Sequence, residues 1–482
     1  MSSDPRQAAG EVDPTDVVVI GGGVGGLIAA RACALAGKRV ILVEASGALG
    51  GTVGSHVVDG LRLDSGAESF ATRRGTVAAY LEGLRLGELG LADRIVQPNP
   101  DGAWVQLAER AIQLPRTGLL GIPAHPFDPT IVTAIGRAGV ARAKADLLLP
   151  AAVGAKERTL GGLVRARMGD RVVDRLVAPI VSGVHSAHPD EVDADAVAPG
   201  LRAGLAEHGS LGRAVASMRA ASPAGSAVSG ILGGVHLLVD ALVADLARLG
   251  VDVRTSLAVE AVHRHRSHEG AAASDDWHVE LADGRGIDAA GVVLAIPAAG
   301  LIHLFSGLAP RAVTEGWPEP SSVELVTLVV RAPELDAAPR GTGVLVAADA
   351  PGIRAKALTH ATAKWPWLKE LAGDRHVLRL SYGRAGGDDD TAGLPDEELT
   401  AIAVRDASAL LGVDLAGRVT GSARVRWTNA LPFAASGHRE RVQAVRDEAA
   451  EHPGLEITGS AVAGTGLASV VADAQAAAAR VL

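Results

Sequence analysis

Three glycines in the stretch GGGVGG have a spacing that could hold a phosphate group. Gly21, Gly23 and Gly26 follow the pattern Gly-x-Gly-x-x-Gly. In that pattern the first glycine permits a tight turn, the second lets the backbone approach a pyrophosphate, and the third lets a helix pack closely on a strand. Glu44 ends a later apolar run, where a carboxylate can accept hydrogen bonds from a ribose. The pattern therefore predicts a dinucleotide site.

The segments on either side of these glycines fit this interpretation. Residues 16–20 (DVVVI) are typical of a buried parallel strand, and residues 27–37 (LIAARACALAG) are typical of a helix that ends at a glycine. Residues 39–44 (RVILVE) predict a second buried strand. The helix would direct free N–H groups at the phosphates. The carboxylate of Glu44 would repel a 2′-phosphate, which disfavours NADP, but this motif alone leaves FAD and NAD open.

Two further glycine-rich segments favour FAD. Gly50 and Gly51 precede a predicted hairpin that leads into residues 64–69 (DSGAES). Such an extension could lie against the far end of a long cofactor, and NAD enzymes do not need it. Residues 455–482 predict a strand ending at Gly459, a glycine loop and an Ala-rich helix. The N-terminus of that helix could stabilise negative charge on a reduced flavin, although an ordinary glycine-capped helix is the alternative.

The hydrophobic patterns along the chain predict an α/β protein. We expect a Rossmann-like FAD-binding domain assembled from separated segments, together with a sheet-based substrate domain and a helical domain. The predicted division is a disordered tail over residues 1–14, an FAD-binding domain over 15–75, 225–300 and 421–482, a mainly helical domain over 76–224, and a substrate-binding domain over 301–420.

Composition and charge exclude several classes of function. The 482 residues are 48% apolar with a formal net charge of −9, which suits a globular protein and argues against a nucleic-acid partner. Cys33 is the single cysteine, which excludes an intrachain disulfide and a four-thiolate iron–sulfur cluster. The run HRHRSH (263–268) has no acidic or thiol partner at ligand spacing, so we predict no metal site. No signal-peptide or membrane-spanning pattern stands out, so we expect a cytoplasmic protein with at most peripheral membrane contact.

Longer blocks of the sequence resemble those of a known family. The sequence resembles the FAD-dependent protoporphyrinogen/coproporphyrinogen oxidases, within the monoamine-oxidase-like flavoproteins, over residues 15–480. The resemblance rests on GGGVGGL with VEAS, DSGAESF, LVAPIVSGVHSAHPDEV (176–192), LGGVHLLVDAL (232–242), KALTHATAKWPW (356–367), LRLSYGR (378–384) and TGSAVAGTGL (458–467).

That resemblance implies an activity, a cofactor and a substrate class. The implied enzyme oxidises a porphyrinogen in haem biosynthesis, removing six electrons in three steps and passing them from FAD to O₂ to give three H₂O₂. The resemblance favours coproporphyrinogen III as the substrate, with protoporphyrinogen IX as the alternative, and it suggests a haem-pathway enzyme as a partner. The flavin carries the chemistry, so we assign no catalytic residue with certainty.

The same resemblance implies which residues contact FAD. They occupy the first glycine loop, the end of the second strand, the segments near residues 52 and 66–69, and the C-terminal loop. The implied contacts are Gly21, Gly22, Gly23, Val24, Gly25, Gly26, Glu44, Ala45, Thr52, Gly66, Ala67, Glu68, Ser69, Val259, Trp427, Gly459, Thr465, Gly466 and Leu467.

Cationic residues are the expected partners of the substrate, because the implied tetrapyrrole carries propionate groups. Arg73 and Arg74 follow DSGAESF and are the first candidates, and Lys356 and Lys364 come next. The alternative for all four is a solvated surface position. Phe433 could stack on the tetrapyrrole, or it could equally pack in the core.

Two other functions stay open at this point. One is another flavin amine oxidase or desaturase of the same superfamily, although amine oxidases usually need an aromatic cage and this chain has only two tyrosines. The other is a non-enzymatic escort protein of the same fold. Bound flavin would argue against the escort, and oxidation of a porphyrinogen would separate the oxidase from both.

Overall fold

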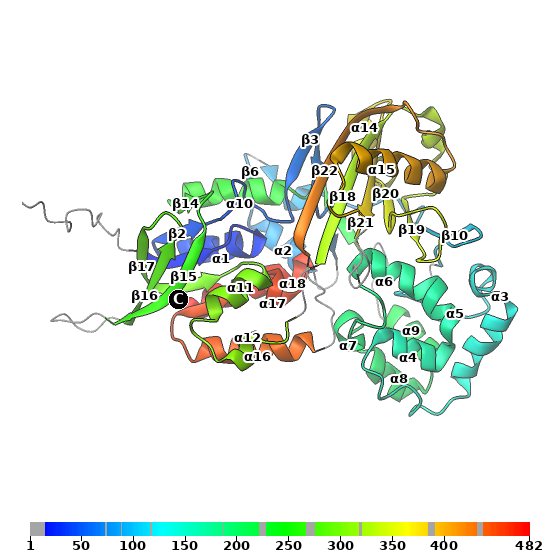
Figure 1. Cartoon of the computed structure of the whole chain (residues 1–482), viewed down its shortest axis with the longest axis horizontal. Coiled ribbons are helices and arrows are strands. Elements are labelled where there is room, and N and C mark those ends of the chain that lie inside the picture. Colours follow the sequence, from blue (N-terminus) through cyan, green and yellow to red (C-terminus); the bar gives the residue numbers. More distant parts are fainter. Residues whose placement is uncertain are drawn as a thin grey trace, which may run out of the picture.

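A computed structural model describes most of the chain. The described residues are 15–72, 75–87, 89–115, 118–185, 187–220, 228–266, 275–317, 321–383, 391–430 and 437–482. Figure 1 shows three groups of elements: a first sheet between two layers of helices, a second sheet with one long helix on it, and a cluster of helices below the second sheet.

The first sheet joins strands from the beginning, the middle and the end of the chain. Its order is β14-β2-β1-β17-β16-β15, and β23 also pairs with β17. The pairs of β1 with β2 and with β17, of β2 with β14, and of β17 with β23 are parallel, whereas β15, β16 and β17 pair antiparallel. The strands are β1 (Thr15–Ile20), β2 (Val40–Val43), β14 (Asp252–Arg254), β15 (Val259–Arg266), β16 (Asp275–Leu281), β17 (Gly286–Leu294) and β23 (Leu455–Ile457).

Helices cover both faces of this sheet because its central strands are apolar on both sides. Successive side chains of a strand point to opposite faces. Val17 and Val19 therefore pack with α1 (Val24–Leu35), α10 (Leu237–Arg248) and α18 (Leu467–Val481). Val18 and Ile20 pack on the other face with α11 (Ala298–Phe305), α16 (His438–Ala450) and α17 (Ser460–Ala463).

The second sheet has the order β10-β9-β19-β20-β21-β18-β22 and is antiparallel apart from the β9–β19 pair. One of its faces packs on α15 (Asp396–Leu411), and α13 (Ala361–Lys364) and α14 (Pro366–Ala372) connect β20 to β21. Its strands are β9 (Trp104–Gln106), β10 (Ala111–Gln113), β18 (Ser321–Val330), β19 (Gly343–Val346), β20 (Ala357–His360), β21 (His376–Tyr382) and β22 (Val419–Ala430).

Two features of this sheet differ from the predicted domain division. Strands β9 and β10 come from the segment 76–224, which the sequence pattern predicts to be mainly helical. Strand β22 begins two residues before 421, so the predicted boundary between 420 and 421 falls inside a strand of the second sheet. A short strand leaves too little periodic pattern to be assigned to a sheet from sequence.

The helical cluster is built around its own apolar core. Residues from α3, α4, α6, α8 and α9 meet in that core, and the carboxyl half of α3 turns away at Gly136, whose φ is +69°. The helices are α3 (Pro129–Lys144), α4 (Leu160–Met168), α5 (Asp170–Val172), α6 (Ala178–His185), α7 (Ala194–Val197), α8 (Leu201–His208) and α9 (Leu211–Ala220), with a π-helical turn at Val173–Val177 between α5 and α6.

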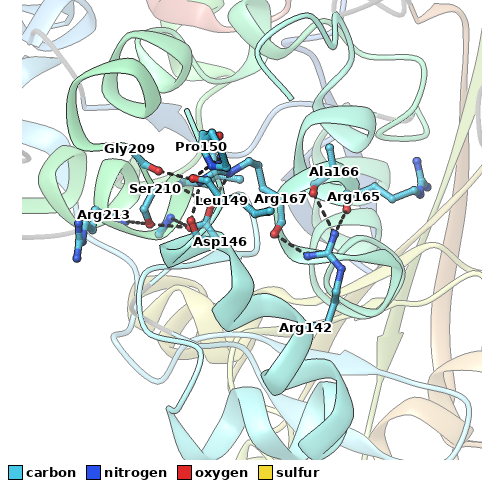
Figure 2. Close-up of polar contacts among 12 residues, drawn as sticks. Arg142, Asp146, Leu149, Pro150, Arg165, Ala166, Arg167, Gly209, Ser210 and Arg213 are labelled. Carbon is cyan, nitrogen blue, oxygen red and sulfur yellow. Dashed lines mark hydrogen bonds and ion pairs between the residues drawn. The ribbon is translucent and has the colours of Figure 1, made fainter. Parts of the chain in front are cut away.

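A buried ion pair fixes three elements of this cluster to one another. Nε of Arg167 in α4 lies 2.6 Å from Oδ1 of Asp146, and both side chains are almost fully buried. The same guanidinium donates hydrogen bonds to the carbonyl oxygens of Pro150 and Gly209. The other carboxylate oxygen of Asp146 accepts from Oγ of Ser210 at the beginning of α9 (Figure 2). Each group of the pair is therefore satisfied inside the core.

Shorter elements connect these three groups. A hairpin of β3 and β4 packs on the second sheet and on α13 and α14. A separate three-stranded sheet has the order β5-β13-β8. The remaining elements are β3 (Ser55–Val58), β4 (Leu61–Asp64), β5 (Phe70–Ala71), α2 (Thr76–Glu82), β6 (Arg85–Leu86), β7 (Leu89–Gly90), η2 (Ala92–Arg94), β8 (Ile95–Val96), β11 (Gly118–Leu119), β12 (Ile122–Pro123), η3 (Ala145–Leu147), β13 (Val228–Ile231), α12 (Arg311–Thr314) and η5 (Pro333–Ala337).

Candidate flavin site

The loop between β1 and α1 gives each of its spaced glycines a different task. Gly21 has a φ of +105°, and a Cβ there would overlap the carbonyl of Ala295. A Cβ on Gly26 would overlap the carbonyl oxygen of Gly21, so only glycine lets the helix lie this close to the strand. A Cβ on Gly23 would meet nothing within 4 Å. The backbone at Gly23 is therefore open to a ligand.

The carboxylate of Glu44 is held directly beside this loop. Its Oε2 accepts a hydrogen bond from the amide of Gly22 at 2.6 Å, and its Oε1 accepts from the amide of Ser46 at 2.8 Å. Each carboxylate oxygen has a second lone pair. The oriented carboxylate can therefore still accept a hydrogen bond from a sugar hydroxyl.

The two ends of the chain meet at the same edge of the first sheet. A Cβ on Gly25 would lie 2.9 Å from Cα of Gly459 and 3.4 Å from Cγ1 of Val470. The amide of Ala295 donates to the carbonyl of Ile20, and the amide of Thr458 donates to the carbonyl of Leu294. The carboxyl ends of β1, β17 and β23 thus lie together, which is where ligands bind in open parallel sheets.

A second glycine segment closes another side of the site. The amide of Gly50 donates to the carbonyl of Gly22 at 2.8 Å, and the amide of Ala67 donates to the carbonyl of Thr52 at 2.9 Å. A Cβ on Gly66 would lie 3.3 Å from Cζ2 of Trp427 in β22. This segment therefore links the first glycine loop to the second sheet.

These segments surround a cavity of about 730 Å³. Most of the predicted cofactor contacts line it, although they come from regions far apart in the sequence. The predicted residues in its wall are Gly21, Gly23, Val24, Gly25, Glu44, Ala45, Thr52, Ala67, Ser69, Val259, Trp427, Gly459, Thr465, Gly466 and Leu467.

Four predicted contacts lie outside this wall. Gly22 and Gly26 face neighbouring protein atoms, as tight packing of the loop requires. Gly66 faces the carbonyl of Thr52 and the ring of Trp427, and Glu68 points toward the second sheet.

The cavity wall also contains residues that the sequence reasoning missed. Among them are Pro297, Gly300, His303 and Leu304 in and before α11, and Arg426 and Thr428 in β22. The α11 set could have been found, because it directly follows the buried strand that ends in VVLAI and so lies at a carboxyl edge. The sequence of β22 (Val419–Ala430) contains no comparable motif.

A residue of the second sheet also forms part of the cavity wall. Trp427 in β22 lines the cavity, and its Nε1 is buried without a hydrogen-bond partner within the described residues. The glycine loop and the oriented carboxylate of Glu44 together fit a dinucleotide.

Glu68 is engaged by two cations of the second sheet region. Its carboxylate lies 2.5 Å from Nζ of Lys364 and 3.4 Å from a guanidinium nitrogen of Arg379. Burial by itself raises the pKa of Glu68, but the attraction of both cations outweighs it and lowers the pKa to about 2. Lys364 and Glu68 therefore bind each other, and neither lines the cavity. The sequence prediction was a cofactor contact for Glu68 and a substrate contact for Lys364.

The other predicted substrate contacts divide into two groups. Lys356 is 1% exposed, and its ammonium donates to the carbonyl of Gly383 at 2.6 Å, so it is held inside the second sheet region and does not line the cavity. Arg73, Arg74 and Phe433 lie outside the described residues, as does the predicted tail over 1–14. The substrate contacts assigned to Arg73, Arg74 and Phe433 therefore stay predictions.

A buried histidine pair lies in the second sheet away from the cavity. Nε2 of His360 and Nδ1 of His376 are 3.1 Å apart. Burial, reinforced by the neighbouring His376 and Lys369, lowers the pKa of His360 to about 3. The ring of His360 is therefore neutral at physiological pH.

Two other features of the described residues bear on the class of protein. No group of three or more His, Cys, Asp or Glu side chains in the described part of the chain could hold a metal ion. No helix within the described ranges is long and apolar enough to cross a membrane.

A sheet with a parallel centre, helices on both faces and a glycine loop at its carboxyl edge is typical of a dinucleotide-binding protein. The profile of the family described as "Flavin containing amine oxidoreductase" matches residues 24–482. The chain belongs to this family and is a flavin oxidoreductase, as the sequence predicted.

Named relatives span nearly the whole chain. It is 31% identical to a coproporphyrinogen III oxidase of Mycobacterium leprae, over 95% of this chain and 96% of that one. It is 30% identical to a coproporphyrinogen III oxidase of Propionibacterium freudenreichii subsp. freudenreichii, over 95% of this chain and 89% of that one. A crystal structure from Exiguobacterium sp. 255-15, provisionally named a protoporphyrinogen oxidase, superposes with a TM-score of 0.81 at 26% identity and covers 97% of this chain and 98% of its own. The predicted α/β fold class is therefore confirmed.

Proposed function

We propose that this chain is an FAD-dependent oxidase that converts coproporphyrinogen III to coproporphyrin III with O₂ as the electron acceptor. The observation that carries the proposal is the alignment of relatives named coproporphyrinogen III oxidase with 95% of the chain. The cavity supports it, because its walls offer open backbone at Gly23 for a phosphate, the oriented carboxylate of Glu44 for a sugar, and Trp427 of the second sheet.

FAD is the flavin that suits this site best. Glu44 would accept hydrogen bonds from the adenosine ribose, and the amides at the beginning of α1 would bind the pyrophosphate where Gly23 leaves the backbone open. Trp427 and the beginning of α18 at Gly466 would enclose the ring system. FMN lacks the adenosine that Glu44 is placed to bind.

The overall reaction balances with O₂ alone. Each of three steps removes two electrons and two hydrogens from the porphyrinogen, and one O₂ takes them up as H₂O₂. The flavin, when bound, supplies a hydride acceptor. The chain has to hold the substrate within about 3–3.5 Å of that acceptor and keep water out, and the apolar side chains in the cavity wall suit this task.

We also propose that two arginines close in sequence to the cavity-lining segment bind the substrate's carboxylates. Arg73 and Arg74 closely follow Ala71, which lines the cavity. A guanidinium can bind a carboxylate through two parallel hydrogen bonds. With Lys364 held by Glu68, these two arginines are the better candidates.

The test compares two porphyrinogens under identical conditions. Purified protein reconstituted with FAD receives coproporphyrinogen III or protoporphyrinogen IX in air, and porphyrin fluorescence and H₂O₂ are followed. We expect faster oxidation of coproporphyrinogen, with three H₂O₂ for each porphyrin. A higher rate with protoporphyrinogen would reassign the substrate, in line with the name given to the Exiguobacterium protein. Flavin binding without oxidation of either compound would overturn the proposal.

A further inference from the structure

An ion triad connects the wall of the flavin cavity to the second sheet. Glu68 lies between Ala67 and Ser69, both of which line the cavity. Its own side chain points the other way, toward Lys364 at the end of α13 and Arg379 in β21. The triad therefore anchors the cavity segment 66–69 from behind.

The triad carries an excess of positive charge in a poorly solvated place. The exposed side-chain fractions are 12% for Glu68, 17% for Lys364 and 15% for Arg379. One carboxylate faces two cations, so one positive charge is left over. Because little solvent screens these groups, their charge acts over a longer distance than at the surface.

Neighbouring titratable groups form their hydrogen bonds outside the triad. The carboxylate of Asp64 lies 2.7 Å from Nδ1 of His236 and accepts from two backbone amides, so it forms no ion pair with Lys364 or Arg379. Burial, together with the charge of Arg379, lowers the pKa of His56, which keeps that ring neutral at physiological pH. Arg379 also donates a long hydrogen bond to the carbonyl of Asp64, which orients its guanidinium.

We propose that Glu68, Lys364 and Arg379 are positioning residues that hold the 66–69 segment against the flavin and place one excess positive charge behind it. This inference rests on the proposed function. A flavin gains negative charge on reduction, so a fixed positive charge nearby stabilises the reduced form. The triad therefore raises the reduction potential of the cofactor and makes it a better acceptor of electrons from the porphyrinogen.

The experiment measures the midpoint potential of the flavin in the holoenzyme by dye-equilibrated reduction. Lys364→Met and Arg379→Met each remove a positive charge and should shift the potential to more negative values. Glu68→Gln removes the negative charge and should shift it to more positive values. Lys364→Arg keeps the charge and should leave the potential near that of the wild type. A purely structural role would not give shifts of opposite sign.

Arg375 provides a matched control. It pairs with Asp59 at 3.1 Å and so joins the same two regions of the chain, but neither residue lines the cavity. Arg375→Met should therefore cost some stability and leave the potential unchanged.

The outcomes separate this inference from the proposed function. A holoenzyme whose potential is unchanged in Lys364→Met and Glu68→Gln, or shifts in the same direction in both, overturns the triad's role alone. A wild-type chain that binds no flavin overturns the proposed function and this inference together. Flavin affinity and thermal unfolding of each variant, measured in parallel, identify any variant that is misfolded. If Lys364→Met is misfolded, the charge-conserving Lys364→Arg is compared with Glu68→Gln, and the triad's role requires a wild-type potential in the first and a more positive potential in the second.

Discussion

Gly25 and Gly459 are in direct backbone contact, although they lie near opposite ends of the chain. A methyl group on Gly25 would lie 2.9 Å from Cα of Gly459, closer than carbon atoms approach without overlap. Helix α1 begins beside Gly25, and α17 follows Gly459 directly and leads into α18, which shares one apolar core with α1. The contact places the two glycine-rich ends of the sequence on one cavity, as the sequence reasoning required.

Gly23→Ala should impair flavin binding, whereas Gly26→Ala should reduce the stability of the fold. A Cβ on Gly23 enters open space, so the apoprotein should unfold at the wild-type temperature while flavin affinity falls. A Cβ on Gly26 overlaps the carbonyl oxygen of Gly21, which should cost about 1–3 kcal/mol of unfolding free energy even without flavin. Thermal unfolding of the apoproteins and flavin titration measure both effects. Equal stability losses in the two variants would contradict the assignment of Gly23 to the ligand.

Glu44→Ala should distinguish FAD from FMN. The carboxylate is held by the amides of Gly22 and Ser46, and we assign its remaining lone pairs to the adenosine ribose. Losing a charged hydrogen bond should weaken FAD binding by about 1.5–3 kcal/mol, or roughly 10- to 100-fold. FMN has no adenosine and should bind both proteins with similar affinity. Fluorescence quenching titrations with the two flavins are the measurement, and equal losses for both would remove Glu44 from the ribose site.

Arg167→Met should destabilise the helical cluster without affecting the cofactor. The substitution leaves the carboxylate of Asp146 buried without its cation, which typically costs about 3–5 kcal/mol. Arg165 lies on the same helix, and its side chain is 37% exposed in its ion pairs. Arg165→Met should therefore cost less than about 1 kcal/mol. Urea unfolding gives both values, and flavin content should match the wild type in each variant that folds.

His360→Gln should reduce the sensitivity of the fold to mild acid. The folded-state pKa of His360 is about 3, below its ordinary value of 6.5, so the unfolded chain takes up the proton first as pH falls. The neutral ring therefore stabilises the fold fully above pH 6.5, and this contribution is lost progressively toward pH 3. Urea midpoints from about pH 7 to about pH 4 should fall less steeply in the variant than in the wild type. Parallel curves would mean that His360 is protonated in the folded chain.

The parts of the site that depend on local spacing could be predicted from sequence. Gly21, Gly26 and Glu44 act through a turn, a helix start and a strand end that are contiguous in the chain, so their geometry follows from the motif. The fold class could also be predicted from local sequence, because apolar runs show which segments become the buried strands of the first sheet.

The direction in which a side chain points could not be predicted in the same way. Glu68 lies between two residues of the cavity wall, but its carboxylate turns to Lys364 and Arg379, which only tertiary contact brings near. Lys356 looked like an accessible cation, but it is buried beside the carbonyl of Gly383. A charged side chain within a motif indicates that it has an ion-pair or hydrogen-bond partner, but the sequence does not show which residue that partner is.

The strand order of the first sheet has a consequence for biosynthesis. β17 pairs with β1 on one side, and on its other side with β16 and then with β23, which lies near the carboxyl terminus. A nascent chain on the ribosome thus has an open position beside β17 until residues 455–457 emerge, and the loop at Gly459 that completes the cavity follows them. Until then the first sheet exposes an unpaired strand edge, which is the kind of surface that chaperones protect.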